Sequence, residues 1–317
     1  MKIVITDSAT LTQNNDLPID RLNDLGEVFI YGNLTGEALF EAVKDADAIL
    51  CNKTIIDKSL IDAAPKLKYV GLFATGYNNV DTAYAKLKGI TVCNAGSYST
   101  SAVAQQTFAY ILAHFSSVDK YSALVKNGDW ISSPTFSMLC CPTDELYGKT
   151  IGVIGYGSIG KKVCEIAKAF DMNVLVYTRT PKEDTTVKFV SFDELLKNSD
   201  IVSAHCPLTD QNAKMFNSDA FSKMKKSAMF INTARGGLVD ENALYDALLN
   251  GDIAAAAVDV LTAEPMSATC VLKDAPNITI TPHTAWAPLS TRKRLLDIVF
   301  DNLLSFKCGN LKNVVNK

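Results

Sequence analysis

The sequence lacks the features that mark several large classes of protein. None of its apolar runs reaches the ~18 residues that a membrane-spanning helix needs. No charged and then apolar leader precedes the first expected strand, which begins at Lys2. Acidic and basic residues are mixed along the chain, the net charge is −3, and no basic stripe marks a nucleic-acid surface. These absences predict a cytoplasmic protein whose partners include neither a membrane nor a nucleic acid.

The eight cysteines show no spacing that is typical of a metal or redox site. No two of them have the C-x-x-C arrangement, and several lie within apolar runs. Reduced, packed thiols and the absence of a metal site are therefore expected. Histidine is scarce, since the chain holds only His114, His205 and His283.

What the sequence does have is a repeated alternation of short apolar runs and helical patterns. Its 317 residues suit roughly two domains of about 150 residues each. Strands are expected at 2–6, 27–31, 47–50, 67–73 and 90–94, and then at 150–154, 173–177, 200–204, 227–231, 254–258 and 277–280. Helices are expected at 35–45, 99–115 and 289–309, with an irregular stretch at 127–149. Strands that alternate with helices predict an α/β fold with parallel sheets.

A glycine-rich turn begins the second series. The segment TIGVIGYGSIGKKV contains G-x-G-x-x-G at Gly155, Gly157 and Gly160, after an apolar strand and before a helix. The first glycine allows the tight turn, the second lets a pyrophosphate approach, and the third lets the helix pack closely on the strand. Free N–H groups around Ser158 and Ile159 can then bind phosphate at the helix N-terminus. A tight turn without a ligand is the alternative, and the flanking strand and helix favour dinucleotide binding.

The acid that an NAD site usually carries is missing. A carboxylate about 20 residues further along normally binds the ribose 2′-hydroxyl. Here the strand NVLVY is followed by Thr178, Arg179 and Thr180, with Lys182 close behind. An arginine and a hydroxyl suit a 2′-phosphate, so NADP(H) is favoured over NAD(H). The alternative is that Arg179 covers the adenine and that the chain uses NAD(H).

Polar residues follow three strands of the second half. Arg235 follows one strand, Asp259 and Glu264 follow the next, and His283 follows the last. Ligands of open α/β sheets bind outside the carboxyl ends of the strands, so these side chains are expected to converge near the nicotinamide. Arginine can bind a carboxylate through two parallel hydrogen bonds, histidine can pass a proton to a carbonyl oxygen, and glutamate can orient that histidine. The set suits hydride transfer to a 2-keto acid.

Several of these residues also have a plainer interpretation. Glu264 precedes Pro265 and can be an ordinary loop acid. His114 lies on a mostly apolar helix and is expected to be structural, whereas His205 either lines the cofactor pocket or packs structurally. His283 lies in a loop after a terminal strand with no core around it, which favours a catalytic role for it.

The motifs together resemble the D-isomer-specific 2-hydroxyacid dehydrogenase family. The resemblance covers nearly all 317 residues, and its markers are GVIGYGSIG, HCPLT, FINTARGGLVDENAL, AAAVDVLTAEP and ITPHTAWA. It implies two Rossmann-like domains with parallel sheets and an active site in the cleft between them. The flavodoxin-like substrate domain would comprise residues 1–98 and 288–317, and the dinucleotide-binding domain residues 99–287. Closure is implied about hinges near 98–100 and 284–290.

The resemblance also assigns roles to individual residues. Arg235 would bind and orient the substrate, His283 would be the acid or base, and Glu264 would support His283. N–H groups of the loop FATGYNNVD would hold the substrate carboxylate, namely those of Ala74, Thr75 and Gly76. Besides the glycine turn and the Thr178–Thr180 segment, the implied cofactor contacts are Val103, Pro207, Thr233, Ala234 and Asp259, the last near the nicotinamide amide.

Within the family, the segments LTAEP, NGDWISSPTF and PHTAWAPLSTRKRLLDIVFDNL are similar to the glycerate dehydrogenase or hydroxypyruvate reductase branch. The implied reaction is the NAD(P)H-dependent reduction of hydroxypyruvate or glyoxylate to D-glycerate or glycolate. The alternatives are the same chemistry on a bulkier 2-keto acid or on pyruvate, and a non-catalytic protein that senses a dinucleotide. A homodimer is implied, with the apolar segment 127–145 as an arm.

Overall fold

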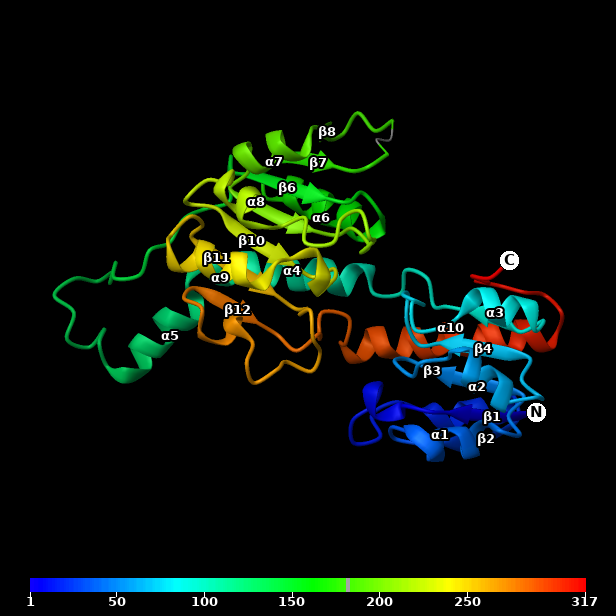
Figure 1. The fold of residues 1–317 in the computed structure, drawn as a ribbon. Coiled ribbons are helices and arrows are strands. Elements are labelled where there is room, and N and C mark those ends of the chain that lie inside the picture. The colour runs from blue at the N-terminus through cyan, green and yellow to red at the C-terminus, as the bar shows by residue number, and fades with distance from the viewer. Residues whose placement is uncertain (181–182) are drawn as a thin grey trace. The chain divides into compact units, whose positions relative to one another are not determined.

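The computed structural model describes residues 1–180 and 183–317 and divides the chain into two units (Figure 1). Unit 1 comprises Met1–Ser99 and Ala287–Lys317, and unit 2 comprises Thr100–Trp286. Lys182, which the sequence places after the NVLVY strand, lies outside the described residues. In the part of the chain that is described, each helix is too short or too polar to cross a bilayer.

Unit 1 is built on a five-stranded parallel sheet with the order β2-β1-β3-β4-β5. The strands are β1 (Lys2–Ile5), β2 (Glu27–Ile30), β3 (Ala48–Cys51), β4 (Tyr69–Leu72) and β5 (Thr91–Cys93). Every residue of β3 and β4 is buried, which is why these central strands read as unbroken apolar runs.

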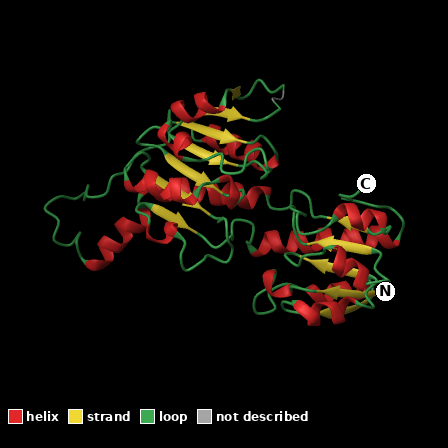
Figure 2. Cartoon of the chain, in the orientation of Figure 1, coloured by secondary structure: helices red, strands yellow, loops and turns green. Residues whose placement is uncertain are grey.

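Helices cover both faces of this sheet (Figure 2). They are α1 (Gly36–Val43), α2 (Lys58–Ala63), α3 (Thr82–Leu87) and α10 (Leu289–Lys307), with 3₁₀ turns at Ser8–Thr10 and Ile19–Asp24. The first three share one apolar cluster with the sheet, and α10 packs its Phe306 ring against Tyr69, with centroids 4.9 Å apart. The carboxylates of Asp57 and Asp81 cap α2 and α3 by accepting backbone N–H groups.

Unit 2 is built on a seven-stranded parallel sheet with the order β12-β11-β10-β9-β6-β7-β8. The strands are β6 (Thr150–Ile154), β7 (Asn173–Tyr177), β8 (Lys188–Phe189), β9 (Ile201–Ala204), β10 (Met229–Asn232), β11 (Ala255–Val258) and β12 (Ile278–Ile280). The chain runs outward in both directions from β6, so the strand order reverses between β6 and β9. The crevice outside the carboxyl ends of such a pair is where this architecture binds ligands.

The helices of unit 2, apart from α5, form two layers on the sheet. The helices of the unit are α4 (Thr100–Ser116), α5 (Val118–Asn127), α6 (Ser158–Ala169), α7 (Phe192–Asn198), α8 (Ser218–Ser222) and α9 (Glu241–Leu249), with 3₁₀ turns at Gly236–Leu238 and Val271–Asp274. One apolar cluster joins the sheet to α4 and α6, and a second joins it to α7, α8 and α9. Both faces are therefore covered, and the expected α/β class with two parallel sheets is confirmed.

The differences from the expected elements have a physical reason. Helix α5 was not expected: Val118, Tyr121 and Val125 recur at helical spacing, but the helix has only 10 residues and buries none of them. Strand β8 has only two residues and is too short to show a pattern. The stretch from residue 128 to 149 is irregular, as expected.

Candidate active site

The glycine turn after β6 requires glycine at its first and third positions. Gly155 has φ +97°, and a Cβ there would lie 2.7 Å from the carbonyl carbon of His205. A Cβ on Gly160 would lie 2.0 Å from the carbonyl oxygen of Gly155. The left-handed turn and the close packing of α6 on the strand thus exclude any side chain at these positions.

The second glycine behaves differently, because a Cβ on Gly157 would meet nothing within 4 Å. Gly157 is the N-cap of α6, its backbone carbonyl accepts from Lys161, and no acid lies in the first turn. Ser158 is exposed and Ile159 half-buried beside this open space. Open space at a helix N-terminus, where the positive end of the helix dipole lies, fits the phosphates of a dinucleotide.

The loop after β7 carries the positive group that the sequence predicts. Thr178 is half-buried, while Arg179 and Thr180 are exposed. The acid further along, Asp184, turns back to the glycine loop, where it accepts from the Tyr156 hydroxyl at 2.7 Å. With this carboxylate engaged, Arg179 is an exposed positive charge near the end of β7.

Asp184 and Tyr156 shift each other's proton affinity. Hydrogen bonds from Thr186 and then from Tyr156 hold the pKa of Asp184 well below its usual range. Burial, followed by the hydrogen bond to Asp184, raises the pKa of Tyr156 to about 12. Tyr156 therefore stays protonated and keeps donating to the Asp184 carboxylate.

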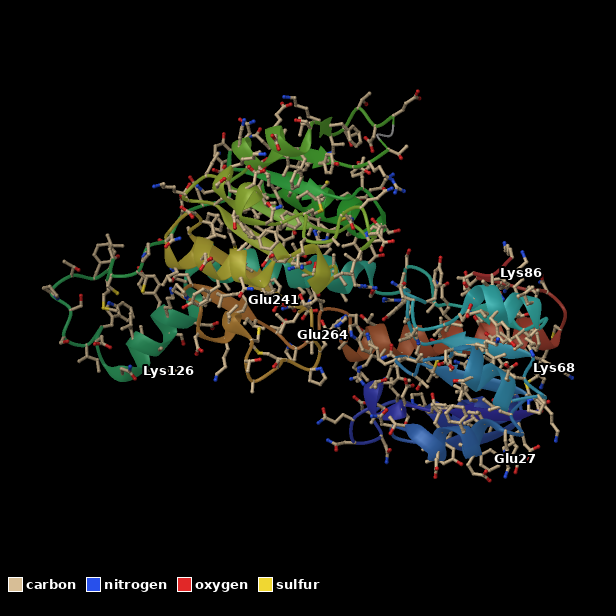
Figure 3. All side chains as sticks on the ribbon, viewed as in Figure 1. Glu27, Lys68, Lys86, Lys126, Glu241 and Glu264 are labelled. Atoms are coloured by element: carbon tan, nitrogen blue, oxygen red, sulfur yellow. The ribbon has the colours of Figure 1, made fainter. Side chains whose placement is uncertain are left out.

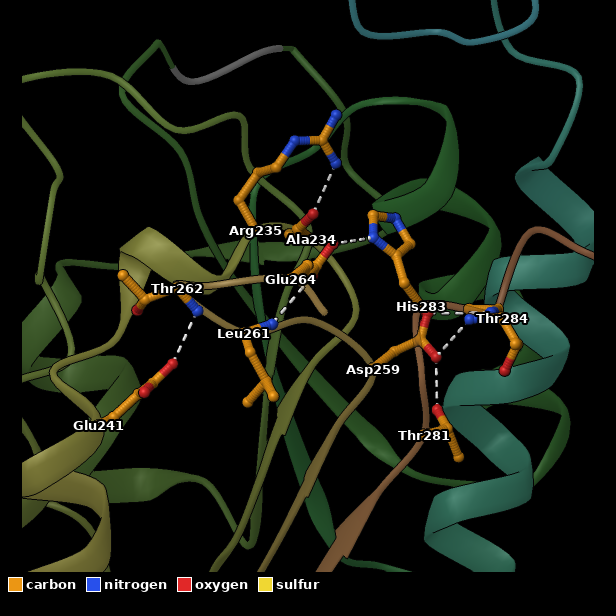
Figure 4. A network of polar contacts seen from close by, with 11 residues as sticks. Ala234, Arg235, Glu241, Asp259, Leu261, Thr262, Glu264, Thr281, His283 and Thr284 are labelled. Carbon is orange, nitrogen blue, oxygen red and sulfur yellow. Dashed lines mark hydrogen bonds and ion pairs between the residues drawn. The ribbon is translucent and has the colours of Figure 1, made fainter. Parts of the chain in front are cut away.

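His283 and Glu264 form a pair on two neighbouring loops (Figure 4). His283 lies after β12 and Glu264 after β11, where Figure 3 also labels it. The Nδ1 atom of His283 is 2.6 Å from Glu264 Oε2, while Oε1 accepts from the Leu261 N–H at 3.0 Å. The two side chains are 26% and 35% exposed, so the pair is open to a ligand. Since Nδ1 faces the carboxylate, Nε2 is the nitrogen that can exchange a proton with a substrate.

Arg235 lies on the loop after β10. A buried asparagine holds the backbone of this loop through hydrogen bonds. The Asn232 side chain donates to the carbonyl of Arg235 at 2.9 Å and accepts from the Ala234 N–H at 3.0 Å. The exposed guanidinium of Arg235 donates to the Ala234 carbonyl at 2.7 Å. A Cβ on Gly236 would lie 2.0 Å from the carbonyl carbon of Leu261, so glycine here lets the Arg235 loop approach the Glu264 loop.

The carboxylate of Asp259 is buried and organises the loop that carries His283. It accepts backbone N–H groups from Thr284 and Ala285, each at 2.9 Å, and the hydroxyl of Thr281. The Asp259 carbonyl accepts the N–H of His283 at 2.8 Å. His283 has φ +55°, a left-handed conformation that an L-residue adopts only where its surroundings enforce it. Contact of Asp259 with the nicotinamide amide stays a prediction.

The other expected cofactor residues lie at the carboxyl ends of the same sheet or on α4. Val103 and Thr233 are buried, Ala234 is half-buried and Pro207 is exposed. His205 follows β9 with its Nε2 2.8 Å from the Ser203 hydroxyl. His114 lies on α4 beside the Phe115 ring, and burial, then the charge of Lys120, lowers its pKa.

In unit 1, the loop after β4 offers backbone donors. The N–H groups of Ala74, Thr75 and Gly76 make no hydrogen bond to any residue that the structure describes. The loop is held through its carbonyls, since the Asn94 side chain donates to Thr75 O at 2.7 Å and the Ala95 N–H to Ala74 O at 2.9 Å. Three adjacent free donors can accommodate an anion.

Across residues 1–180 and 183–317 there is no group of three or more His, Cys, Asp or Glu side chains that could hold a metal ion.

The chain is similar to a family of known proteins. A profile described as "D-isomer specific 2-hydroxyacid dehydrogenase, NAD binding domain" matches residues 108–285. The chain belongs to the D-isomer-specific 2-hydroxyacid dehydrogenase family. Similar curated proteins include a hydroxypyruvate reductase of Blautia hydrogenotrophica, 40% identical over 100% of both chains, and a glycerate dehydrogenase of Methylorubrum extorquens, 37% identical over 89% of both.

A solved structure of the same family is also similar. It is an NADPH-dependent glyoxylate/hydroxypyruvate reductase from Sinorhizobium meliloti in complex with citrate, with a TM-score of 0.85 and 28% identity, covering 99% of this chain and 97% of that one. The resemblance drawn from the motifs is confirmed, as is the expectation of an oxidoreductase of this family. A nicotinamide dinucleotide as the cofactor class is confirmed as well.

Sequence reasoning missed the residues that support this dehydrogenase site. Asn232 could have been noticed, because an asparagine at the end of a strand often shapes the turn that follows. Tyr110 and Thr281 carry no such signal, since they are 171 residues apart and meet only in the folded unit.

We expect His205 to make stability depend on pH. Burial lowers its pKa from 6.5 to about 4, so between these values the unfolded chain binds a proton that the folded chain does not. The free energy of unfolding therefore falls as the pH falls through this window, by about 3 kcal/mol at its lower end. Urea unfolding across the window should show that His205→Gln removes most of this loss.

His114→Gln is the matched control, because the pKa of His114 is lowered less far and its removal should flatten the pH dependence only slightly. If the free energy of unfolding depended on pH equally in the His205→Gln variant and in the parent chain, His205 would not be the cause of that dependence.

Proposed function

We propose that this chain reduces small 2-keto acids with NAD(P)H, taking hydroxypyruvate or glyoxylate to D-glycerate or glycolate. The observation that carries the proposal is the His283–Glu264 pair, with Nε2 of His283 left for a substrate and Arg235 on the adjacent loop. The names of the hydroxypyruvate reductase, glycerate dehydrogenase and glyoxylate/hydroxypyruvate reductase relatives support this substrate class.

The proposed mechanism divides the work among these residues. Arg235 binds the substrate carboxylate through its planar donors, and the N–H groups of Ala74, Thr75 and Gly76 are proposed to bind it as well. When bound, the reduced nicotinamide supplies the hydride that adds to the keto carbon. Protonated His283 gives its Nε2 proton to the carbonyl oxygen as negative charge develops there. Glu264 stabilises the imidazolium through Nδ1 and fixes the orientation of the ring.

The two units have separate roles in this proposal. Residues 99–287 are proposed to bind the dinucleotide, because they contain the glycine turn, the strand reversal at β6 and β9, and the loop of Thr178, Arg179 and Thr180. Residues 1–98 and 288–317 are proposed to bind the substrate. Val103, Pro207, Thr233 and Ala234 remain the proposed lining of the cofactor site.

The test of the reaction is a comparison of initial rates of hydroxypyruvate and glyoxylate reduction. His283→Ala should lower kcat by at least about 100-fold, because a positioned acid contributes roughly 10²- to 10⁴-fold. Glu264→Gln should lower kcat less, since the ring keeps a hydrogen-bond acceptor but loses the charge that stabilises the imidazolium.

Near-normal turnover of His283→Ala would refute the acid–base role. Turnover only with bulkier 2-keto acids or with pyruvate would show that these, and not hydroxypyruvate or glyoxylate, are the substrates. Cofactor binding without turnover of any keto acid would favour a dinucleotide sensor.

We further propose that NADP(H) is the preferred cofactor, because Arg179 is exposed at the end of β7 and the carboxylate of Asp184 is engaged by Tyr156. Arg179→Ala should raise the KM for NADPH about ten-fold or more and leave the KM for NADH nearly unchanged. Lys197→Ala removes one exposed positive charge from α7 and serves as the control. A parent chain that prefers NADH, with no effect of Arg179→Ala on NADPH, would place Arg179 against the adenine instead.

A homodimer is the third part of the proposal. The arm, residues 127–145, exposes Ile131, Phe136 and Leu139 to about 90% or more of their surfaces and Trp130 to 50%. Apolar side chains exposed together mark an interaction surface, and a second copy of this chain is the proposed partner.

Sedimentation at micromolar concentration should therefore show a dimer, and Phe136→Glu combined with Leu139→Glu should convert it to a monomer. Leu87→Glu introduces the same charge at an 82% exposed leucine of unit 1 and should leave the dimer intact. A monomeric parent chain would refute the proposed homodimer.

A further inference from the structure

A buried tyrosine on α4 contacts the loop that carries His283. Tyr110 is 4% exposed, and its phenol oxygen is hydrogen-bonded to the hydroxyl of Thr281. Helix α4 runs past Thr281 and Thr284 in Figure 4. Burial raises the pKa of Tyr110, so the phenol keeps its proton and remains able to donate.

The direction of this hydrogen bond follows from a proton count. A threonine hydroxyl has one proton, and that of Thr281 is donated to the Asp259 carboxylate. The contact between Tyr110 and Thr281 therefore has the phenol as donor and the threonine oxygen as acceptor. The result is a chain of donors that runs from Tyr110 through Thr281 to the buried charge of Asp259.

The charge at the end of that chain holds the catalytic loop. Asp259 accepts the N–H groups of Thr284 and Ala285, which directly follow His283, and its carbonyl accepts the N–H of His283 itself. These bonds hold His283 in its left-handed conformation, with Nδ1 against Glu264. A shift of the Asp259 carboxylate would therefore move the imidazole relative to its partner.

We propose that Tyr110 is a positioning residue for the reaction: its hydroxyl, acting through Thr281 and Asp259, holds His283 where Nε2 can protonate the substrate. This inference rests on the proposed function for the role of His283, and on the hydrogen bonds alone for the geometry. The Tyr110 phenol also hydrogen-bonds the Gln106 side chain on the same helix, and its hydrogen bond to the loop that carries His283 is the one with Thr281.

The first experiment removes only the hydroxyl. Tyr110→Phe should lower kcat roughly ten-fold, the scale of one buried hydrogen bond, and leave the KM for the keto acid unchanged. The KM should be spared because the groups proposed to bind the carboxylate are not part of this chain of hydrogen bonds. Tyr84→Phe is the matched control, since it removes a phenol that donates to a carboxylate, that of Asp62 at 2.8 Å, on the surface of unit 1.

The second readout needs no turnover. Amide hydrogen exchange of Thr284 and Ala285 should become several-fold faster in Tyr110→Phe, because the Asp259 carboxylate that accepts both N–H groups loses its anchor. Exchange in α4 itself should stay slow, which separates local loosening of the loop from general unfolding of the helix.

The third experiment tests whether Tyr110 acts through Thr281. Thr281→Val removes the intermediate hydroxyl and should lower kcat at least as much as Tyr110→Phe, whereas Thr281→Ser keeps that hydroxyl and should retain most of the activity. The double variant of Tyr110→Phe and Thr281→Val should be no slower than Thr281→Val alone. Losses that multiply in the double variant would overturn the proposed chain of contacts.

The outcomes separate this inference from the proposed function. A parent chain that reduces no keto acid refutes the proposed function, while the exchange rates of Thr284 and Ala285 still decide the role of Tyr110. Unchanged kcat and unchanged exchange in Tyr110→Phe refute the positioning role and leave the proposed function standing.

Discussion

The site in unit 2 depends on one buried negative charge, the carboxylate of Asp259. A carboxylate withdrawn from water must be matched by donors, because an unpaired buried charge costs several kcal/mol. Here the donors are the hydroxyl of Thr281 and the N–H groups of Thr284 and Ala285, so the loop closes around the charge. The left-handed conformation of His283 between these donors is the consequence.

A second constraint acts between the loops rather than within one. Three glycines at the carboxyl edge of the sheet allow backbone segments to approach more closely than any side chain would permit. Gly155 and Gly160 bring α6 onto β6 and leave the helix N-terminus open at Gly157. Gly236 brings the Arg235 loop to the Leu261 loop, from which Glu264 reaches His283. The candidate phosphate site and the candidate acid–base pair thus share one edge of one sheet.

The two units differ in what they contribute. Unit 2 holds the charged and titratable groups, each held by hydrogen bonds that the fold supplies, as with Asn232 beneath Arg235. Unit 1 contributes backbone: three adjacent N–H groups on a loop whose carbonyls are tied to Asn94 and Ala95. A cation and a set of backbone donors are two different ways in which a protein can bind an anion.

Much of this could be predicted from local patterns. The strand at 150–154 and the one at 173–177 were expected with the bounds that the structure has, because each is a short apolar run between turns. Arg235, Glu264 and His283 were expected to converge, since parallel strands end at the same edge. Helix α5 was missed although Val118, Tyr121 and Val125 recur at helical spacing, because a short exposed helix gives only a weak pattern.

What the sequence by itself determined is the order of the elements, the glycine turn and the types of side chain at the strand ends, all of which depend on residues close together in the chain. Only the tertiary structure decided how those side chains are held. The Asp259–Thr281 bond spans 22 residues and the Tyr110–Thr281 bond spans 171. The packing of α4 against the sheet brings such partners together. No local sequence pattern around Tyr110 or Thr281 predicts that packing.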